Sequence, residues 1–104
     1  MSETLVKFDE PITDSTGGRY FVEAVGRQRE DGLWEGHLEF LPVNERAERI
    51  TSDRETTQPN RRAVDYWAQG LTRVYLAGAL NRARLSPSAH ERARPMFDSR
   101  QKGR

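Results

Sequence analysis

One predicted strand carries the side chains best suited to acid–base chemistry. Glu35, His37 and Glu39 alternate along the sequence, so a β-strand would place all three on one face. Such a row could exchange protons with a substrate or hold a metal ion weakly through one or two ligands. No nucleophile accompanies the row, and opposed charges are ordinary on a solvated sheet face. A small enzyme built on this row is therefore the least favoured function, and we predict no catalytic residue, cofactor or metal.

A polar segment before a predicted helix could bind an anion. The candidate residues are Thr56, Thr57, Gln58 and Asn60, because amides at a helix start attract negative charge. Asparagine is also a preferred N-cap, so helix capping is the simpler interpretation of these polar side chains. Arg61 and Arg62 in the first turn oppose the helix dipole, which indicates an anionic neighbour, with Asp65 or Glu55 as the candidates.

Basic residues accumulate toward the end of the sequence. Residues 81–104 contain 7 Lys/Arg and 2 Asp/Glu, a net charge of +5, whereas residues 1–80 contain 10 and 14, a net charge of −4. A basic tail can neutralise phosphates. The alternative function is therefore a nucleic-acid-associated protein, with four predicted contact residues: Arg61, Arg62, Arg92 and Arg94. A solvated tail is the simpler interpretation, because acidic residues dilute the charge and the tail has one aromatic residue.

The elements that position these groups begin with a β-hairpin. Tyr20 to Arg29 and Leu33 to Val43 alternate and are rich in strand-forming residues. A three-residue loop, Glu30 to Gly32, with Gly32 in the left-handed conformation would pair Arg29 with Leu33. This register collects apolar side chains on one face, whereas a slip of one residue would invert the segregation. That face is predicted to contain Val22, Ala24, Trp34, Leu38 and Phe40.

Two further segments extend the predicted sheet. Ala47 to Thr57 reads as a polar third strand at an edge of the sheet. Leu5 to Phe8 could add a fourth strand within an N-terminal arm, residues 1–19, although proline and glycine interrupt this region.

An apolar helix is predicted after Asn60. One helical face should cover the sheet, and it collects Val64, Trp67, Ala68, Leu71, Val74, Tyr75, Gly78, Ala79 and Leu85. Gly70 costs about 1 kcal/mol relative to alanine inside a helix, so the segment is either one long helix or two, with Thr72 capping the second. The fold class is α+β in βββα order, a three- or four-stranded antiparallel sheet packed against this helix. The domain spans residues 20–85, and the basic tail, residues 86–104, is predicted to be disordered.

Two leucines of this helix lie away from its predicted core face. Leu76 and Leu80 make the segment from Val74 to Leu80 apolar on two sides, which a helix covered on one side does not require. Tyr66 also lies off the core face. We predict that these residues contact a partner, so the main functional expectation is a non-enzymatic module that self-associates or binds another protein.

Length and composition set outer limits on these interpretations. A chain of 104 residues allows one domain, with 35% apolar and 32% charged residues and no cysteine. No apolar segment approaches the roughly 20 residues of a membrane span, and no secretory signal is visible. The expected setting is cytoplasmic, away from membranes.

Several segments resemble a group of small uncharacterised bacterial proteins. The resemblance rests on Trp34-Glu35-Gly36, Glu55 to Asn60, Tyr66-Trp67-Ala68 and Val74 to Leu80. It implies a bacterial, cytoplasmic setting and carries no activity, ligand or partner to this chain.

Overall fold

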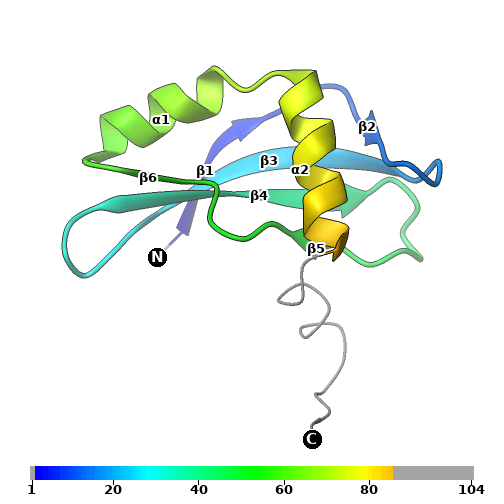
Figure 1. Cartoon of the computed structure of the whole chain (residues 1–104), viewed down its shortest axis with the longest axis horizontal. Coiled ribbons are helices and arrows are strands. Elements are labelled where there is room, and N and C mark those ends of the chain that lie inside the picture. Colours follow the sequence, from blue (N-terminus) through cyan, green and yellow to red (C-terminus); the bar gives the residue numbers. More distant parts are fainter. Residues whose placement is uncertain (1, 86–104) are drawn as a thin grey trace, which may run out of the picture.

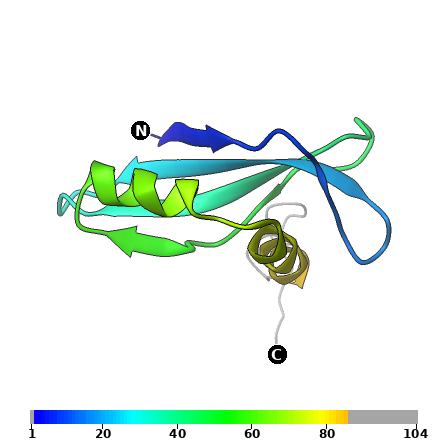
Figure 2. The same ribbon diagram turned by 90° about the horizontal axis from the view of Figure 1, so that it is seen from above.

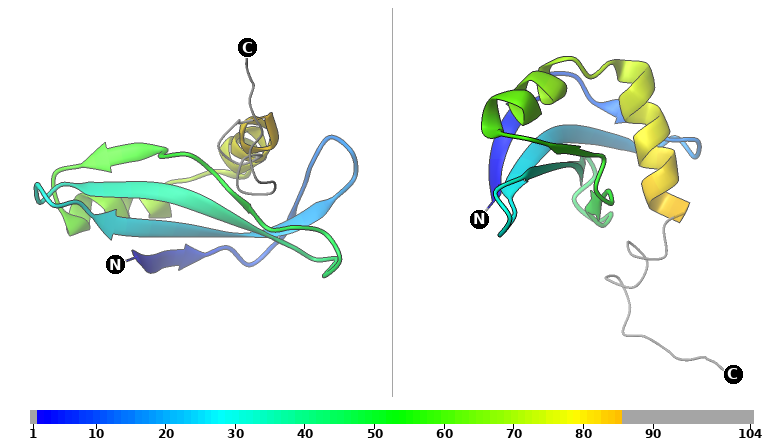
Figure 3. Two further views of the ribbon diagram at one scale, coloured as in Figure 1. Left: turned by 90° about the horizontal axis from the view of Figure 1, so that it is seen from below. Right: turned by 60° about the vertical axis from the view of Figure 1, so that its left-hand side comes forward.

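An antiparallel six-stranded sheet and two helices form the described part of the chain, residues 2–85 of a computed structural model (Figure 1). The order of the central strands is β1-β3-β4-β5, with β2 also beside β3 and β6 also beside β4. Both helices lie on the same side of the curved sheet (Figure 3, right). The elements are β1 (Ser2–Lys7), β2 (Ile12–Thr13), β3 (Arg19–Gln28), β4 (Trp34–Pro42), β5 (Ile50–Thr51), β6 (Thr56–Gln58), α1 (Arg61–Gln69) and α2 (Arg73–Leu85).

The hairpin of β3 and β4 has the predicted register. Gly32 adopts a φ of 88°, and the amide of Arg29 donates to the carbonyl of Leu33 at 2.7 Å. Ala24 therefore faces Leu38, and Gly26 faces Gly36. The three-residue loop is confirmed, because a glycine in the left-handed region closes it.

The sheet is larger than predicted at both edges. The N-terminal segment contributes β1, which pairs with β3 from Ser2 to Lys7 with an irregularity between Thr4 and Val6, and also β2. The predicted third strand is interrupted, because the hydroxyl of Ser52 accepts from the amide of Leu38 at 2.9 Å in place of a backbone carbonyl. The simple βββα order is therefore wrong, while the α+β class and the antiparallel sheet are confirmed.

The helical segment is broken at Gly70 into α1 and α2. Of the two predicted alternatives, one long helix or two helices, the structure has two. Oδ1 of Asn60 accepts from the amide of Ala63 at 2.8 Å and starts α1, and Oγ1 of Thr72 accepts from the amide of Tyr75 at 3.2 Å at the start of α2. The break redirects the chain, so α1 runs along the strands and α2 runs across them (Figures 1 and 2).

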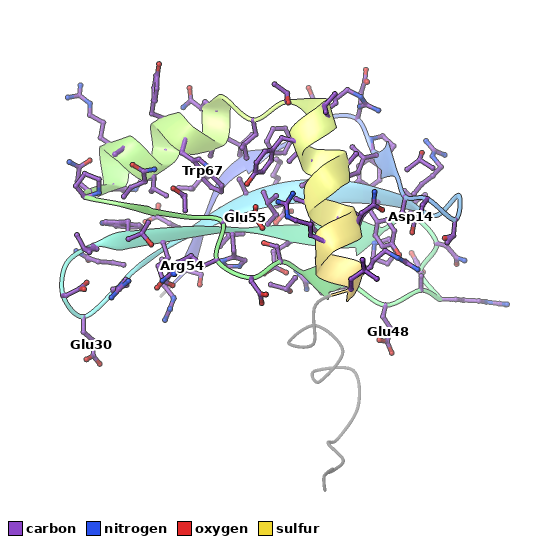
Figure 4. The ribbon with its side chains drawn as sticks, in the orientation of Figure 1. Asp14, Glu30, Glu48, Arg54, Glu55 and Trp67 are labelled. Atoms are coloured by element: carbon purple, nitrogen blue, oxygen red, sulfur yellow. The ribbon has the colours of Figure 1, made fainter. Side chains whose placement is uncertain are left out.

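Trp67 packs between α1 and the sheet, directly over a glycine of β4 (Figure 4). A Cβ added to Gly36 would lie 2.5 Å from Cζ3 of the Trp67 ring and 2.9 Å from Cε3. Such distances are too short for carbon atoms, so only glycine lets the indole ring approach the strand this closely.

Replacing Gly36 with alanine should lower the free energy of unfolding by about 1–3 kcal/mol, because the ring of Trp67 must move out of a packed layer. Gly26, its cross-strand neighbour, is the matched control. A Cβ there would meet the Leu5 side chain at 3.1 Å, a contact that a shift of a few tenths of an ångström in that side chain relieves. Urea denaturation followed by tryptophan fluorescence compares the two alanine variants, and an equal loss of stability would contradict the assigned packing.

Candidate functional site

The predicted acid–base row lies on the face of the sheet opposite the helices, here called the open face. Because Leu38 and Phe40 point into the core beneath the helices, the alternating Glu35, His37 and Glu39 point the other way. Nε2 of His37 lies 2.9 Å from Oε2 of Glu39, and the hydroxyl of Thr51 donates to Oε1 of Glu39 at 3.0 Å. Both carboxylate oxygens are thus engaged within the chain, which favours a charge network over proton transfer.

The pKa of Glu39 shows the balance within this network. Burial alone would raise the pKa of this carboxyl, but hydrogen bonds from His37 and Thr51 and the positive charge of Arg49 lower it overall. The carboxylate is therefore held in its charged form, as an acceptor.

Three arginines surround Glu35 at the hairpin end of the open face. We call Arg27, Arg29 and Arg54 the arginine cluster; their guanidinium nitrogens lie 2.9, 3.6 and 3.9 Å from the Glu35 carboxylate. Their side chains remain 51%, 34% and 58% exposed, whereas Glu35 is 20% exposed. The hydrogen bond from Arg27 and the charges of all three arginines lower the pKa of Glu35 against the effect of its desolvation. Figure 4 shows Arg54 below β4, on the side away from α1.

The structure corrects the predicted partner surface on α2. Leu76 and Leu80 are 2% and 0% exposed and belong to the core, whereas Val74 and Leu85 are 84% and 79% exposed. The physical reason is the break at Gly70: the prediction extended the helical phase of α1 into α2, but the linker starts α2 with a new phase. The side of α2 that packs on the sheet consists of Leu76, Ala79, Leu80 and Ala83.

The side of α2 that faces away from the sheet carries two exposed apolar side chains, one near each end of the helix. Val74 and Leu85 are eleven positions apart, three helical turns, so they lie on one side of the helix about 16 Å from each other. Gly78 and the exposed Asn81 lie between them. An added Cβ at Gly78 would meet only a nitrogen of Arg82 at 3.6 Å, so the space beside it is open. We call Val74, Gly78, Asn81 and Leu85 the outward face of α2.

Every arginine of α2 is paired with a carboxylate from elsewhere in the domain. The pairs are Arg73 with Glu10 at 3.3 Å, Arg82 with Glu55 at 2.8 Å, and Arg84 with Asp14 at 2.9 Å. Figure 4 shows Glu55 and Asp14 on either side of the helix. Arg82 and Arg84, which the sequence analysis counted in the basic segment 81–104, therefore pair within the folded domain and hold α2 in place.

Tyr75 joins one of these pairs. Its hydroxyl donates to the Glu55 carboxylate, and the guanidinium of Arg82 lies 5.5 Å from the centre of its ring. Burial raises the pKa of the Tyr75 hydroxyl, and the adjacent Glu55 carboxylate raises it further. The sequence predicted Glu55 near a helix start, but its partners come from α2.

The predicted nucleic-acid contacts do not gather into one surface. Arg61 donates to Oε1 of Glu3 on β1 through Nη2 at 2.6 Å and Nε at 3.0 Å. The main anionic partner of Arg61 is therefore Glu3, in place of the expected Asp65 or Glu55, and this hydrogen bond raises the pKa of Arg61. Arg62 is exposed and has no ion pair among residues 2–85. Arg92 and Arg94 lie outside the described residues.

Tyr66 lies on α1 with its side chain 82% exposed. The turn before it carries Arg62, which is also exposed. The remaining predicted partner residue is thus on the surface of the helical layer, unlike Leu76 and Leu80.

Asp14 is a buried anchor that the sequence did not single out. Its side chain is 1% exposed and accepts hydrogen bonds from the amide and hydroxyl of Thr16, both at 2.9 Å, and from the amide of Gly18 at 2.7 Å. Burial alone would raise the pKa of Asp14, but these hydrogen bonds and the charge of Arg84 lower it overall. The available signal was an aspartate opening a Ser-Thr-Gly-Gly turn, a common Asx-turn pattern.

Comparison with known proteins assigns no family: no family model, curated protein or solved structure matches the chain. Within residues 2–85, no helix is long and apolar enough to cross a membrane. In the same range, no group of three or more histidine or acidic side chains is arranged to hold a metal ion. The geometry of the surfaces is therefore the basis for inferring function.

Proposed function

We propose that this protein is a non-enzymatic interaction module that self-associates through the outward face of α2. The supporting observation is the exposure of Val74 and Leu85, at 84% and 79%, on one side of a helix whose other side is buried in the core. Exposed apolar side chains that share a helix face are typical of protein contacts.

The outward face of α2 is complementary to a second copy of itself. In an antiparallel pair of α2 helices related by a two-fold axis, Val74 of one copy meets Leu85 of the other, and the same contact repeats by symmetry. Gly78 and Asn81 then lie near the axis. The missing side chain at Gly78 lets two helices approach to about 8 Å, the short end of helix packing distances.

The charges of α2 permit this pairing. An antiparallel pair of basic helices would repel if its arginines were free. Here Arg73, Arg82 and Arg84 each have a carboxylate partner within the same chain.

Sedimentation velocity from low micromolar to submillimolar concentration tests this proposal. We expect a reversible dimer that dissociates in the Val74→Glu and Leu85→Glu variants, because each variant places two carboxylates in the interface. Since both side chains are exposed, circular dichroism and thermal melting should show the fold retained. Gln28→Glu, which adds the same charge at an exposed position in the sheet, is the control and should leave the dimer intact.

Two results would overturn self-association through α2. One is a monomer at every concentration. The other is a dimer that persists in both α2 variants, which would move the contact to another surface.

A further inference from the structure

We propose that the arginine cluster on the open face binds an acidic peptide segment of a partner protein. Arg27, Arg29 and Arg54 converge on one carboxylate, that of Glu35. Three guanidinium groups carry more N–H donors than the two oxygens of Glu35 can accept. Oxyanions that share these donors would be bound by charge-assisted hydrogen bonds, for which arginine is the preferred residue.

Glu35 prepares the cluster for such a ligand. Arginine side chains lose rotamer entropy when they become ordered. The hydrogen bond to Glu35 orders Arg27 before a partner arrives, and Arg29 and Arg54 lie within ion-pair distance of the same carboxylate. Arg29 is held further by Asp31 at 3.0 Å. The Glu35 carboxylate therefore occupies the position of a ligand oxyanion and also competes with it.

Hydroxyl groups flank the cluster on both sides. The cross-strand register aligns Ser2 with Arg27 and Glu35 with Thr57, so one row crosses the sheet from β1 to β6. Ser2 and Thr57 are both exposed. Each adds a donor beside the guanidinium groups.

The remainder of the open face favours a peptide over a nucleic acid. Glu23 and Glu39 face each other on β3 and β4, four positions beyond the Arg27–Glu35 row and about 13 Å along the strands. Lys7 lies beside Glu23 and Arg49 beside Glu39, so the charges of this region balance, and a continuous phosphate backbone along the strands would gain no attraction beyond the arginine cluster. A peptide with acidic residues at one end needs positive charge only at the cluster.

The far end of the open face indicates what the rest of the peptide carries. Phe21 and Leu41 face each other beyond the glutamates, and Phe21 and the nearby Val43 are 44% and 41% exposed. The distance from Glu35 to Leu41 is six strand positions, about 20 Å. The ligand that fits is therefore an extended segment with acidic side chains at one end and apolar side chains about six residues away.

Fluorescence anisotropy with a labelled synthetic peptide tests this site. The peptide carries paired glutamates at one end and paired leucines six residues later, and a peptide with glutamines in place of the glutamates is its control. We expect the acidic peptide to bind and the Arg27→Gln/Arg54→Gln variant to bind it about tenfold more weakly, the loss expected for two solvent-exposed ion pairs. Glu35→Gln should tighten binding, because removing the competing negative charge outweighs the loss of one ordering hydrogen bond, that of Arg27 at 2.9 Å. Unchanged or weaker binding in this variant would contradict the competition assigned to Glu35.

Matched variants keep this test specific. Arg62→Gln removes an exposed arginine outside the open face and should leave the affinity unchanged. Val74→Glu should also leave it unchanged, because α2 packs on the opposite side of the sheet, so failure of the dimer and failure of the peptide site are distinguishable. The proposal is overturned if the acidic and glutamine peptides bind equally. Duplex DNA binding that exceeds peptide binding and requires Arg27 and Arg54 would also overturn it and assign the cluster to nucleic acid.

Discussion

Truncating Leu80 to alanine should lower the free energy of unfolding by about 2–5 kcal/mol, the usual range for removing a fully buried leucine side chain. Leu80 is 0% exposed and packs with residues of the sheet beneath α2. Val74→Ala on the same helix is the matched control. Because Val74 is 84% exposed, its truncation should change stability by no more than about 0.5 kcal/mol. Urea denaturation of both variants measures this difference in the free energy of unfolding, and the dependence of that free energy on urea concentration should match the wild type.

This pair of variants decides which side of α2 packs on the sheet. If the sequence-based phase were right, Val74→Ala would be the costly change and Leu80→Ala the mild one. The structure requires the reverse order. It also explains why self-association must be tested at Val74 and Leu85, since a charged residue at Leu80 would unfold the domain before it could report on an interface.

Replacing Asp14 with alanine should destabilise the domain by about 2–4 kcal/mol, because several donors lose their common acceptor at a buried position. The donors are the amides of Thr16 and Gly18, the Thr16 hydroxyl and the Arg84 guanidinium. Glu10→Ala removes the partner of Arg73 at an exposed position, where ion pairs contribute little. A similar loss of stability in both variants, measured by thermal and urea denaturation, would contradict the anchoring role of Asp14.

The same carboxyl should make stability depend on pH in a defined direction. The pKa of Asp14 is lower in the folded chain than its ordinary value of 3.8. Its contribution is therefore fully present above the unfolded pKa and is lost as the pH falls through the folded pKa. The Asp14→Asn variant should lose less stability than the wild type when the pH is lowered below about 4, and equal acid sensitivity would argue against this linkage.

Some of the fold follows from patterns that act over a few residues. The hairpin register could be predicted because only one pairing separates apolar from polar side chains, and Gly32 supplies the left-handed residue that the loop requires. Asn60 and Thr72 could be assigned as caps because their side chains bond amides three residues away. The lengths of the strands could not be predicted where residues far apart in sequence interact. At Ser52, the side-chain hydroxyl accepts the hydrogen bond from the amide of Leu38 on β4, and the predicted third strand is interrupted there.

The candidate sites also contain some features that follow from local sequence and others that depend on residues far apart in the chain. Alternation along β4 sufficed to place Glu35 on one face with His37 and Glu39. The predicted hairpin register also sets Arg27 opposite Glu35, as the structure confirms. The addition of Arg54 to the arginine cluster depended on the path of the chain after β5. The anionic neighbour of Arg61 was inferred from an unfavourable helix dipole, but its identity as Glu3 depended on β1 joining the sheet.

The sequence by itself determined the α+β class, the hairpin and the start of the first helix at Asn60, because each depends on a periodicity or a cap within a few residues. It left open whether the chain breaks at Gly70, and the structure shows two helices. Only the tertiary structure decided which apolar side of α2 is buried. Both sides carry apolar residues, so periodicity alone cannot choose between them. The choice is made by the direction in which α2 leaves Gly70 and by the carboxylates of Asp14 and Glu55, which hold Arg84 and Arg82 from positions 70 and 27 residues away. With Leu76 and Leu80 turned inward, Val74 and Leu85 face outward, and the surface expected to meet a partner lies on the side of the helix that the sequence had assigned to the core.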